Sequence, residues 1–166
     1  MKNLILIILC SLTVCSCGNG NASRSEDVFP HERVQSAEKN AILKTLNKET
    51  RDAFQRDFDA WSSNWIHDST ISKTYINFSD STFSESIGWK NISGYVKEFM
   101  VKHPEPEPVP ELLHNINVRL FGKGAWVTYE QMDSIRGKKR ETRLMEKVNG
   151  QWKIAGMQTT IYGFHQ

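Results

Sequence analysis

The chain has 166 residues, with 21 Lys and Arg against 19 Asp and Glu, and its three cysteines all lie within the first 17 positions. Residues 18–166 therefore contain no disulfide framework, no cysteine-based zinc site and no cysteine nucleophile. A formal net charge of +2, with both signs mixed along the chain, provides no basic field for a phosphate backbone, so we expect no nucleic-acid partner. The length favours a single domain.

The N-terminus has the pattern of an export signal. Lys2 precedes an apolar run over residues 4–9, which is too short to cross a bilayer as a mature helix. The sequence Val-Cys-Ser-Cys that ends at Cys17 resembles the lipobox of bacterial lipoproteins. This resemblance implies a signal peptide over 1–16, lipidation of Cys17 and an exported protein anchored in the membrane, at its periplasmic face or at the cell surface. The alternative is an ordinary signal peptide that leaves Cys17 as a spare thiol.

A tether and one domain are expected after the signal. Residues 17–34 are rich in Gly, Asn, Ser and charge, as flexible linkers are, and we predict the domain over 35–166. Three triplets that begin at Asp68, Asp80 and Asp133 resemble the short O-glycosylation sites of Bacteroidetes. They agree with an exported lipoprotein of that type.

The first half of the domain is predicted to contain two helices. Phe54, Phe58, Trp61 and Trp65 recur at helical spacing, so we predict helix over 37–66, with residues 47–50 as the place where it can break in two. A second helix is predicted after Gly88, where apolar residues again recur every three or four positions. Between the two helices, residues 74–78 favour a strand and residues 79–86 are rich in turn formers.

The second half is predicted to be strands. Four prolines between residues 104 and 110 exclude helix and central strand there, which indicates a polyproline-like connector. Beyond it the apolar period changes to two, and glycine-containing turns separate the segments. The predicted strands cover 115–121, 125–135, 140–148 and 151–162. Helices followed by hairpins predict an α+β domain with its helices on one face of the sheet.

The last hairpin can be predicted in register, because Asn149-Gly150 is a preferred two-residue turn. The predicted pairs are Lys147 with Trp152, Met145 with Ile154 and Arg143 with Gly156. On this register Gln158 shares a face with Met145, and Met157 lies on the opposite face. Both faces then carry apolar side chains, so we predict that a second copy covers the outer face and that the protein is a homodimer.

Four motifs occur in order along the domain. They are Trp-Ser-Ser-Asn-Trp-Ile-His-Asp at 61–68, Gly-Trp-Lys-Asn-Ile at 88–92, Gly-Ala-Trp-Val-Thr at 124–128 and Asn-Gly-Gln-Trp-Lys-Ile at 149–154. Together they resemble the nuclear transport factor 2-like (NTF2-like) superfamily, and its SnoaL-like branch in particular. The resemblance implies a curved antiparallel sheet wrapped around the N-terminal helices, a cone with an apolar pocket, often in a dimer.

The resemblance leaves three functions open. One is a module in the cell envelope that binds a small apolar ligand or associates with another protein. Another is an isomerase or dehydratase acting next to a carbonyl, with an Asp, His and Tyr set inside the cone. The third is a structural subunit of an envelope assembly whose cone is filled by its own side chains. Enzymatic relatives often have a histidine six residues after the hairpin tryptophan, where this chain has Gln158. Glutamine cannot act as a base at neutral pH, so we favour the binding module.

The candidate site residues follow from these alternatives. His67 and Asp68 are the adjacent pair with acid–base potential, and a cap at a helix end is their simpler role. Scattered histidines without ligand spacing predict no metal site, and no cofactor is expected. Trp61 and Trp89 fit core packing as well as ligand stacking. Arg143 fits an anion anchor as well as a solvated charge. The full set of pocket candidates is Trp61, Tyr75, Trp89, Tyr129, Arg143 and Gln158.

Overall fold

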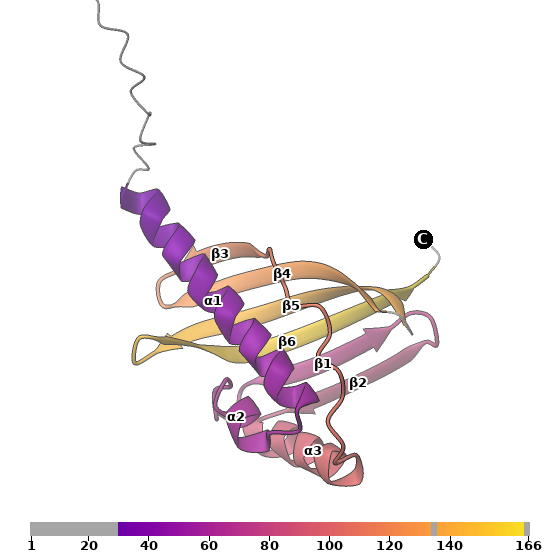
Figure 1. Ribbon diagram of the computed structural model, residues 1–166. Coiled ribbons are helices and arrows are strands. Elements are labelled where there is room, and N and C mark those ends of the chain that lie inside the picture. Colours follow the sequence, from indigo (N-terminus) through magenta and orange to yellow (C-terminus); the bar gives the residue numbers. More distant parts are fainter. Residues whose placement is uncertain (1–29, 134–135, 165–166) are drawn as a thin grey trace, which may run out of the picture.

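A computed structural model describes residues 30–133 and 136–164, which form an α+β fold (Figure 1). The helices are α1 (Pro30–Phe54), α2 (Phe58–Ser62) and α3 (Trp89–Lys102). The strands are β1 (Ser72–Asn77), β2 (Thr82–Ile87), β3 (Asn117–Phe121), β4 (Gly124–Asp133), β5 (Gly137–Val148) and β6 (Gln151–Gly163). The predicted fold class is confirmed, whereas the predicted signal peptide, Cys17 and residues 17–29 of the tether lie outside the described residues.

The six strands form one curved sheet in the order β2-β1-β6-β5-β4-β3. Neighbouring strands run antiparallel, except that β1 and β6 run parallel. The sheet was expected to be antiparallel throughout, and this pair corrects that expectation. Helix α1 lies across one face of the sheet, and α2 and α3 lie beside β1 and β2 at its lower end (Figure 1). We call the face toward α1 the inner face and the opposite face the outer face.

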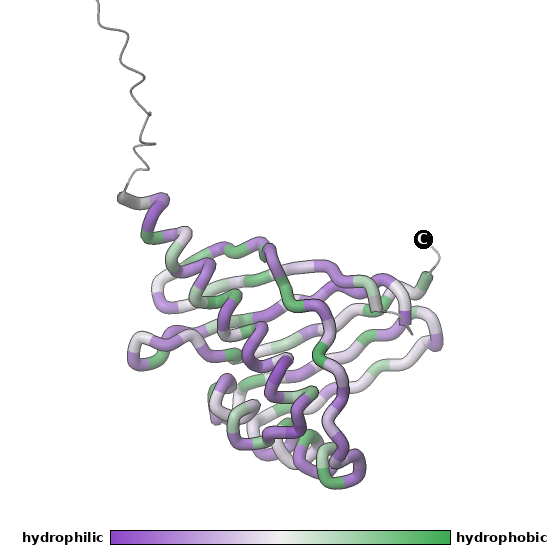
Figure 2. The backbone as a smooth tube through the Cα atoms, viewed as in Figure 1, coloured by the Kyte–Doolittle hydropathy of each residue, from purple (hydrophilic) through white to green (hydrophobic). Residues whose placement is uncertain are grey.

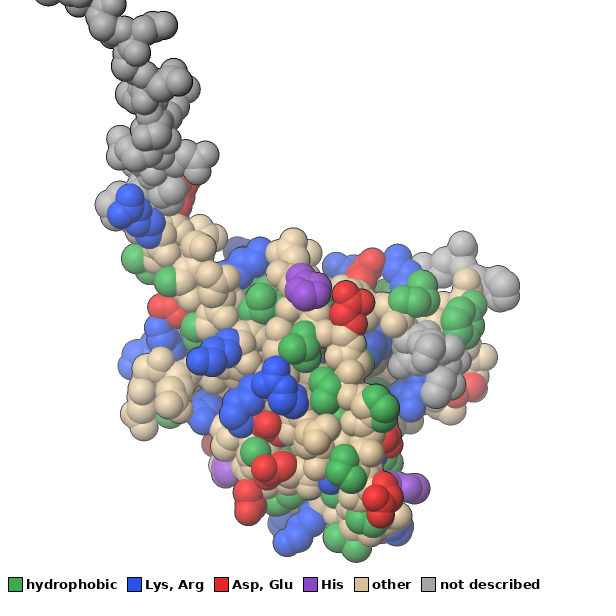
Figure 3. Space-filling view, in the orientation of Figure 1, with side chains coloured by type: hydrophobic (Ala, Val, Ile, Leu, Met, Phe, Trp, Pro, Cys, Tyr) green, Lys and Arg blue, Asp and Glu red, His purple; other side chains and the backbone are tan. Residues whose placement is uncertain are grey.

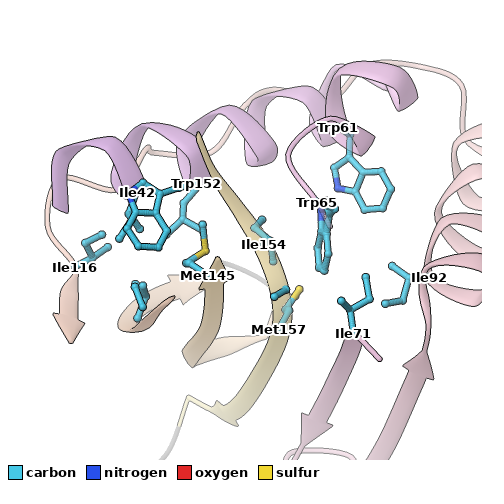
Figure 4. Packing of buried hydrophobic residues seen from close by; sticks show 14 of the residues in the cluster. Ile42, Trp61, Trp65, Ile71, Ile92, Ile116, Met145, Trp152, Ile154 and Met157 are labelled. Carbon is cyan, nitrogen blue, oxygen red and sulfur yellow. The ribbon is translucent and has the colours of Figure 1, made fainter. Parts of the chain in front are cut away.

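The hydrophobic core fills the space between the inner face and the helices. Ile42 of α1, Met145 of β5 and Ile154 of β6 are completely buried, and two tryptophans, Trp61 and Trp65, lie where α2 meets the sheet (Figure 4). Hydrophobic and hydrophilic residues alternate along much of the strands (Figure 2), as a sheet with one covered face requires.

The first helix breaks later than predicted. It continues through residues 47–50 and ends at Phe54, and Arg56 then takes a left-handed conformation with φ of 61°. Asp57 caps α2 by accepting a hydrogen bond from the Ala60 amide at 2.9 Å. Residues 30–34, which the sequence places in the tether, already belong to α1.

The predicted break at residues 47–50 failed because Asn47 bonds to a distant part of the chain. Its side chain donates to the Leu113 carbonyl at 2.9 Å and accepts from the Leu113 amide at 2.8 Å. Leu113 belongs to the connector between α3 and β3, which has neither helix nor strand as predicted. Asn47 therefore holds the connector against an unbroken helix instead of ending it.

Strand β2 occupies most of the segment predicted to be turns. Only residues 78–81 form the turn, and β2 then pairs antiparallel with β1 over its whole length. Five of its six residues are exposed, so this edge strand lacks the alternation of buried apolar residues on which a strand prediction depends. The second helix, in contrast, follows Gly88 as predicted and buries Ile92, Val96 and Met100.

A β-bulge changes the register of the last hairpin. Lys147 pairs with Trp152 and Met145 with Ile154, as predicted, but Leu144 pairs with Gly156 and leaves one residue, Ala155, unmatched. Arg143 consequently pairs with Met157, and the predicted pair with Gly156 is wrong. Because side chains alternate along a strand, the extra residue moves all later side chains of β6 to the face opposite the predicted one.

On the side of the molecule that α1 crosses, neither positive nor negative side chains dominate the surface. Lys and Arg side chains are interspersed there with Asp, Glu and hydrophobic side chains (Figure 3). Among the described residues, no helix is both long enough and apolar enough to span a bilayer.

Candidate functional site

Polar side chains form a row across the inner face of the sheet. Tyr75 of β1 is the strand neighbour of Thr159 of β6, which pairs with Glu141 of β5, which pairs with Tyr129 of β4. Strand neighbours point to the same face, so the four side chains lie side by side. Arg143 lies one row away, and Glu49 joins from α1. We call these six residues the inner polar cluster: Glu49, Tyr75, Tyr129, Glu141, Arg143 and Thr159.

Glu141 is the centre of this cluster, with 3% of its surface exposed. Its carboxylate accepts a hydrogen bond from the Thr159 hydroxyl at 2.9 Å and lies 3.4 Å from Nη2 of Arg143. Nζ of Lys139 lies 3.7 Å from its other oxygen, Oε1. Glu141 is therefore a buried carboxylate in contact with two cations and a hydroxyl.

Arg143 is buried with hydrogen bonds left unmade. Its residue surface is 5% exposed, and neither Nε nor Nη1 has a hydrogen-bond partner. Each of the two flat edges of a guanidinium contains one of these nitrogens, so both edges are incompletely bonded. Burial lowers the pKa of Arg143, but its electrostatic interactions with Tyr129, Glu141 and Glu49 outweigh burial and hold the pKa above its ordinary value. The group stays charged inside the fold.

Tyr129 provides a neutral hydroxyl in the same place. Burial is the main reason that the pKa of Tyr129 lies above its ordinary value, and the carboxylates of Glu141 and Glu49 add to the effect against the opposing influence of Arg143. The phenol therefore remains protonated at neutral pH and can donate a hydrogen bond.

Glu49 brings a second carboxylate to the cluster from the helix side. It is 7% exposed, and Oε1 accepts hydrogen bonds from the indole nitrogens of Trp61 at 2.8 Å and Trp65 at 3.3 Å. Its negative charge also acts on Arg143 and Tyr129. Two tryptophans of the core thus fix the carboxylate next to the inner face of the sheet.

Of the two pocket candidates Trp61 and Tyr75, Tyr75 belongs to the cluster and Trp61 contacts it through Glu49. The ammonium of Lys73 lies 5.9 Å from the Trp61 ring centre and 5.5 Å from that of Tyr75, both cation–π distances. Trp89 stacks on Trp61 at 5.7 Å and, on its other side, on His67 at 4.0 Å. Trp89 therefore belongs to a stack of rings that runs from the buried Trp61 to the exposed His67. Trp61 is the ring of this stack that lies nearest the inner polar cluster.

His67 and Asp68 lie outside the inner polar cluster. Both are exposed. Nε2 of His67 is within hydrogen-bond distance of the Ser62 hydroxyl and carbonyl, at 3.2 and 3.0 Å. Asp68 accepts from the hydroxyl and the amide of Thr70 at 2.6 and 2.7 Å, and these bonds lower the pKa of its carboxyl. The pair closes a turn, and the structure gives it no place in an acid–base set on the inner face.

Gln158 is corrected from the inner to the outer face. It is exposed, pairs with Thr142 and follows the bulge at Ala155. Met157 and Thr159 take the inner positions instead. The bulge therefore explains both the error at Gln158 and the absence of Thr159 from the predicted site.

The sequence analysis also missed Glu49 and Glu141, although each had a readable signal. Glu49 follows Ile42 and Leu46 at helical spacing, so it lies on the apolar stripe of α1. Glu141 alternates with Arg143 and Met145 along β5 and therefore shares their face. In both cases a charged residue on a buried face marked the site.

Two clefts open at the sheet edge. A cleft of about 410 Å³ lies between α1 and β3, and a second of about 260 Å³ follows the free edge of β4 where β3 has not yet begun. Tyr129 is the one member of the inner polar cluster among the residues that line the second cleft. The residues that line this cleft are Asn115, Ile116, Asn117, Thr128, Tyr129, Glu130 and Arg140. Within the described part of the chain, no group of three or more His, Cys, Asp or Glu side chains could hold a metal ion.

Comparisons with known proteins show which solved structures share this fold. No protein-family model and no curated protein sequence matches the chain. Among solved structures, a cystatin-like fold protein from Burkholderia xenovorans superposes with a TM-score of 0.59 at 18% identity, covering 78% of this chain and 95% of the other. An NTF2-like protein of unknown function from Shewanella oneidensis gives a TM-score of 0.52 at 17% identity, over 73% and 97% of the two chains. A putative dehydratase of the NTF2-like family from Streptomyces avermitilis gives 0.57 at 13%, over 77% and 98%. At these identities the likeness shows the fold alone, and the chain has the NTF2-like fold.

Proposed function

We propose that this protein is a lipid-anchored module of the cell envelope, of the SnoaL-like type, that binds a small molecule at its inner polar cluster. The lipobox-like sequence that ends at Cys17 supports the anchor. The observation that carries the binding function is Arg143, which is buried and charged and has two nitrogens without partners.

Stability alone does not account for such an arrangement. A buried donor without a partner costs about 1–3 kcal/mol, and more when it is charged. Apolar residues in place of a buried ion pair are often neutral or stabilising. A domain that only had to fold would therefore lose little stability by replacing Arg143 and Glu141 together with apolar residues. A ligand that bonds to the free nitrogens gives the pair a function.

The test is to identify molecules that the protein carries from its own cells. The full chain is purified from the cell envelope, denatured, and the released small molecules are measured by mass spectrometry. We expect a stoichiometric species from the wild type and at least tenfold less from the double variant Arg143→Met with Glu141→Met. The control is Gln158→Met, on the outer face of the neighbouring strand, which should retain the species. Equal recovery from all three proteins, or none from the wild type, would contradict the proposal.

A second candidate is an isomerase or dehydratase, favoured by Glu49. Its carboxylate lies at the inner face beside Arg143 and the protonated Tyr129, so a base and an oxyanion donor occur together. The dehydratase description of the Streptomyces structure agrees with this candidate. A carbonyl compound identified by the first test should exchange its neighbouring C–H for deuterium with the wild type and not with Glu49→Gln. Equal exchange with both proteins would exclude Glu49 as the base.

Association with a second copy is a further part of the proposal. The outer face carries Trp126, half exposed, and Phe83 and Ile87, each more than half exposed, and such apolar surface favours a partner. Sedimentation velocity of the full chain in detergent should show a dimer at micromolar concentration. A monomer there would refute self-association.

A further inference from the structure

We propose that the ligand of the inner polar cluster is a small monocarboxylic acid whose carboxylate bonds to Arg143. This inference rests on the proposed binding function and names the class of the ligand. Three features support it: the unmade bonds of Arg143, the balance of charge on the inner face, and the apolar surface next to the guanidinium.

The unmade bonds require acceptors. Nε and Nη1 of Arg143 donate to no protein atom, and Nη2 is 3.4 Å from Glu141, at the long end for a charged hydrogen bond. A carboxylate matches the flat, two-donor edge of a guanidinium better than a hydroxyl or an amide does. Charged hydrogen bonds of this kind are also the strong ones.

The charges near Arg143 favour one added negative charge. Lys139 lies against Glu141, and Lys73 lies near the rings of Trp61 and Tyr75. Among the described residues around Arg143, the three cations Arg143, Lys139 and Lys73 therefore outnumber the two carboxylates Glu49 and Glu141 by one charge. A carboxylate neutralises it. A phosphate monoester carries about −1.5 to −2 at neutral pH and exceeds it.

The surface beside Arg143 suits an apolar body. Met157 separates Arg143 from Lys73 in the strand order, so the backbone positions of these two residues are roughly 10 Å apart across two strand spacings. Met157 is buried, and the rings of Tyr75 and Trp61 stand next to Lys73. A short apolar acid can therefore bond to Arg143 and lie over Met157 toward these rings. Tyr129, at the end of the row, also lines the 260 Å³ cleft at the sheet edge.

The test follows the Nε–H resonance of Arg143 by nuclear magnetic resonance in the full chain. Three probes are compared: benzoate, its neutral analogue benzamide, and inorganic phosphate. We expect benzoate to shift this resonance with an affinity at least tenfold higher than that of either other probe. Arg143→Lys, which keeps the charge but loses the two-donor edge, should weaken benzoate at least tenfold in calorimetry. Lys73→Met should weaken it several-fold. Lys138→Met, on the same strand as Arg143 but beside Glu130 on the outer face, is the matched control and should bind as the wild type does.

The outcomes separate this inference from the proposed function. If benzamide binds as well as benzoate, or phosphate binds better, the carboxylate assignment is overturned and ligand binding stands. If no probe moves the Arg143 resonance while a neutral molecule is recovered from the native protein, the assignment is likewise overturned. If no probe binds and no small molecule is recovered from the native protein, both the carboxylate assignment and the proposed binding function are overturned.

Discussion

Arg143 and Glu141 lie two residues apart on β5 and point into the same buried space, with Nη2 and Oε2 at 3.4 Å. Each has at most 5% of its surface exposed. The carboxylate of Glu141 balances the charge of Arg143, but one carboxylate cannot accept hydrogen bonds from all the nitrogens of a guanidinium. Nε and Nη1 of Arg143 therefore have no hydrogen-bond partner. The stability of the pair and its binding role can be tested separately.

The first prediction concerns the stability of this pair. Glu141→Gln leaves the Arg143 charge buried without its nearest counter-charge, and we expect a loss of about 3–5 kcal/mol in the free energy of unfolding. The double variant Arg143→Met with Glu141→Met removes both charges and should recover most of that loss. Urea unfolding followed by tryptophan fluorescence measures both. Additive losses in the double variant would show that the two residues do not act as a pair.

The second prediction concerns pH and the ion pair that ties α1 to the last hairpin. Glu38 accepts hydrogen bonds from Nζ of Lys147 at 2.5 Å and from the Trp152 indole at 2.7 Å. These bonds lower the pKa of Glu38, so its contribution to stability is present above the pKa of the unfolded chain and is lost as pH falls through the folded value.

Glu38→Gln should therefore be less stable than the wild type by about 1 kcal/mol at pH 7, and the difference should disappear as pH falls through the lowered folded pKa of Glu38. The control is Glu98→Gln, which removes an exposed pair with Lys102 on α3 and should leave the unfolding midpoint close to that of the wild type. A difference for Glu38→Gln that persists unchanged at low pH would contradict the assigned role.

The third prediction compares two glycines with the same backbone conformation. Gly137 and Gly150 have φ of 81° and 80°, where any side chain costs about 1–2 kcal/mol. A Cβ at Gly150 meets nothing within 4 Å, whereas a Cβ at Gly137 would lie 2.3 Å from the Gly163 backbone. Gly137→Ala should therefore unfold at markedly lower urea concentration than Gly150→Ala. Equal midpoints would mean that β5 and β6 do not approach each other as described.

The fourth prediction tests the anchor. Radiolabelled palmitate should label the wild type and not Cys17→Ala, since Cys17 is the proposed lipid attachment site. Cys15→Ala should retain the label and serves as the control. A wild type without label, or a label retained by Cys17→Ala, would contradict lipid attachment at Cys17.

The elements of the fold could be predicted largely from local pattern. The stripe after Gly88 gave α3, and the glycine-containing turns gave β3 to β6. The errors have particular causes. Asn47 favours a break in isolation but bonds to Leu113 across the fold, and the exposed edge strand β2 shows no buried alternation. A contact across the fold kept the helix unbroken, and pairing with the preceding strand β1 formed β2.

The site was predicted less completely, because the extra residue Ala155 shifts the pairing register between β5 and β6. Arg143, Tyr129 and Tyr75 were recognised, but the bulge at Ala155 exchanged Gln158 for Thr159 on the inner face. Glu49 and Glu141 were passed over because charged residues are expected at the surface, although their spacing placed them on buried faces. A charged residue that falls at the spacing of the buried apolar residues of a helix or strand is the sequence signal for such a site.

The most direct measurement is a crystal structure of the protein purified from its own cell envelope without added ligand. The proposed function predicts density that is not protein within hydrogen-bond distance of Nε or Nη1 of Arg143, in a shape that water cannot fill. Ordered waters alone at both nitrogens, or a guanidinium fully bonded to protein atoms, would contradict it.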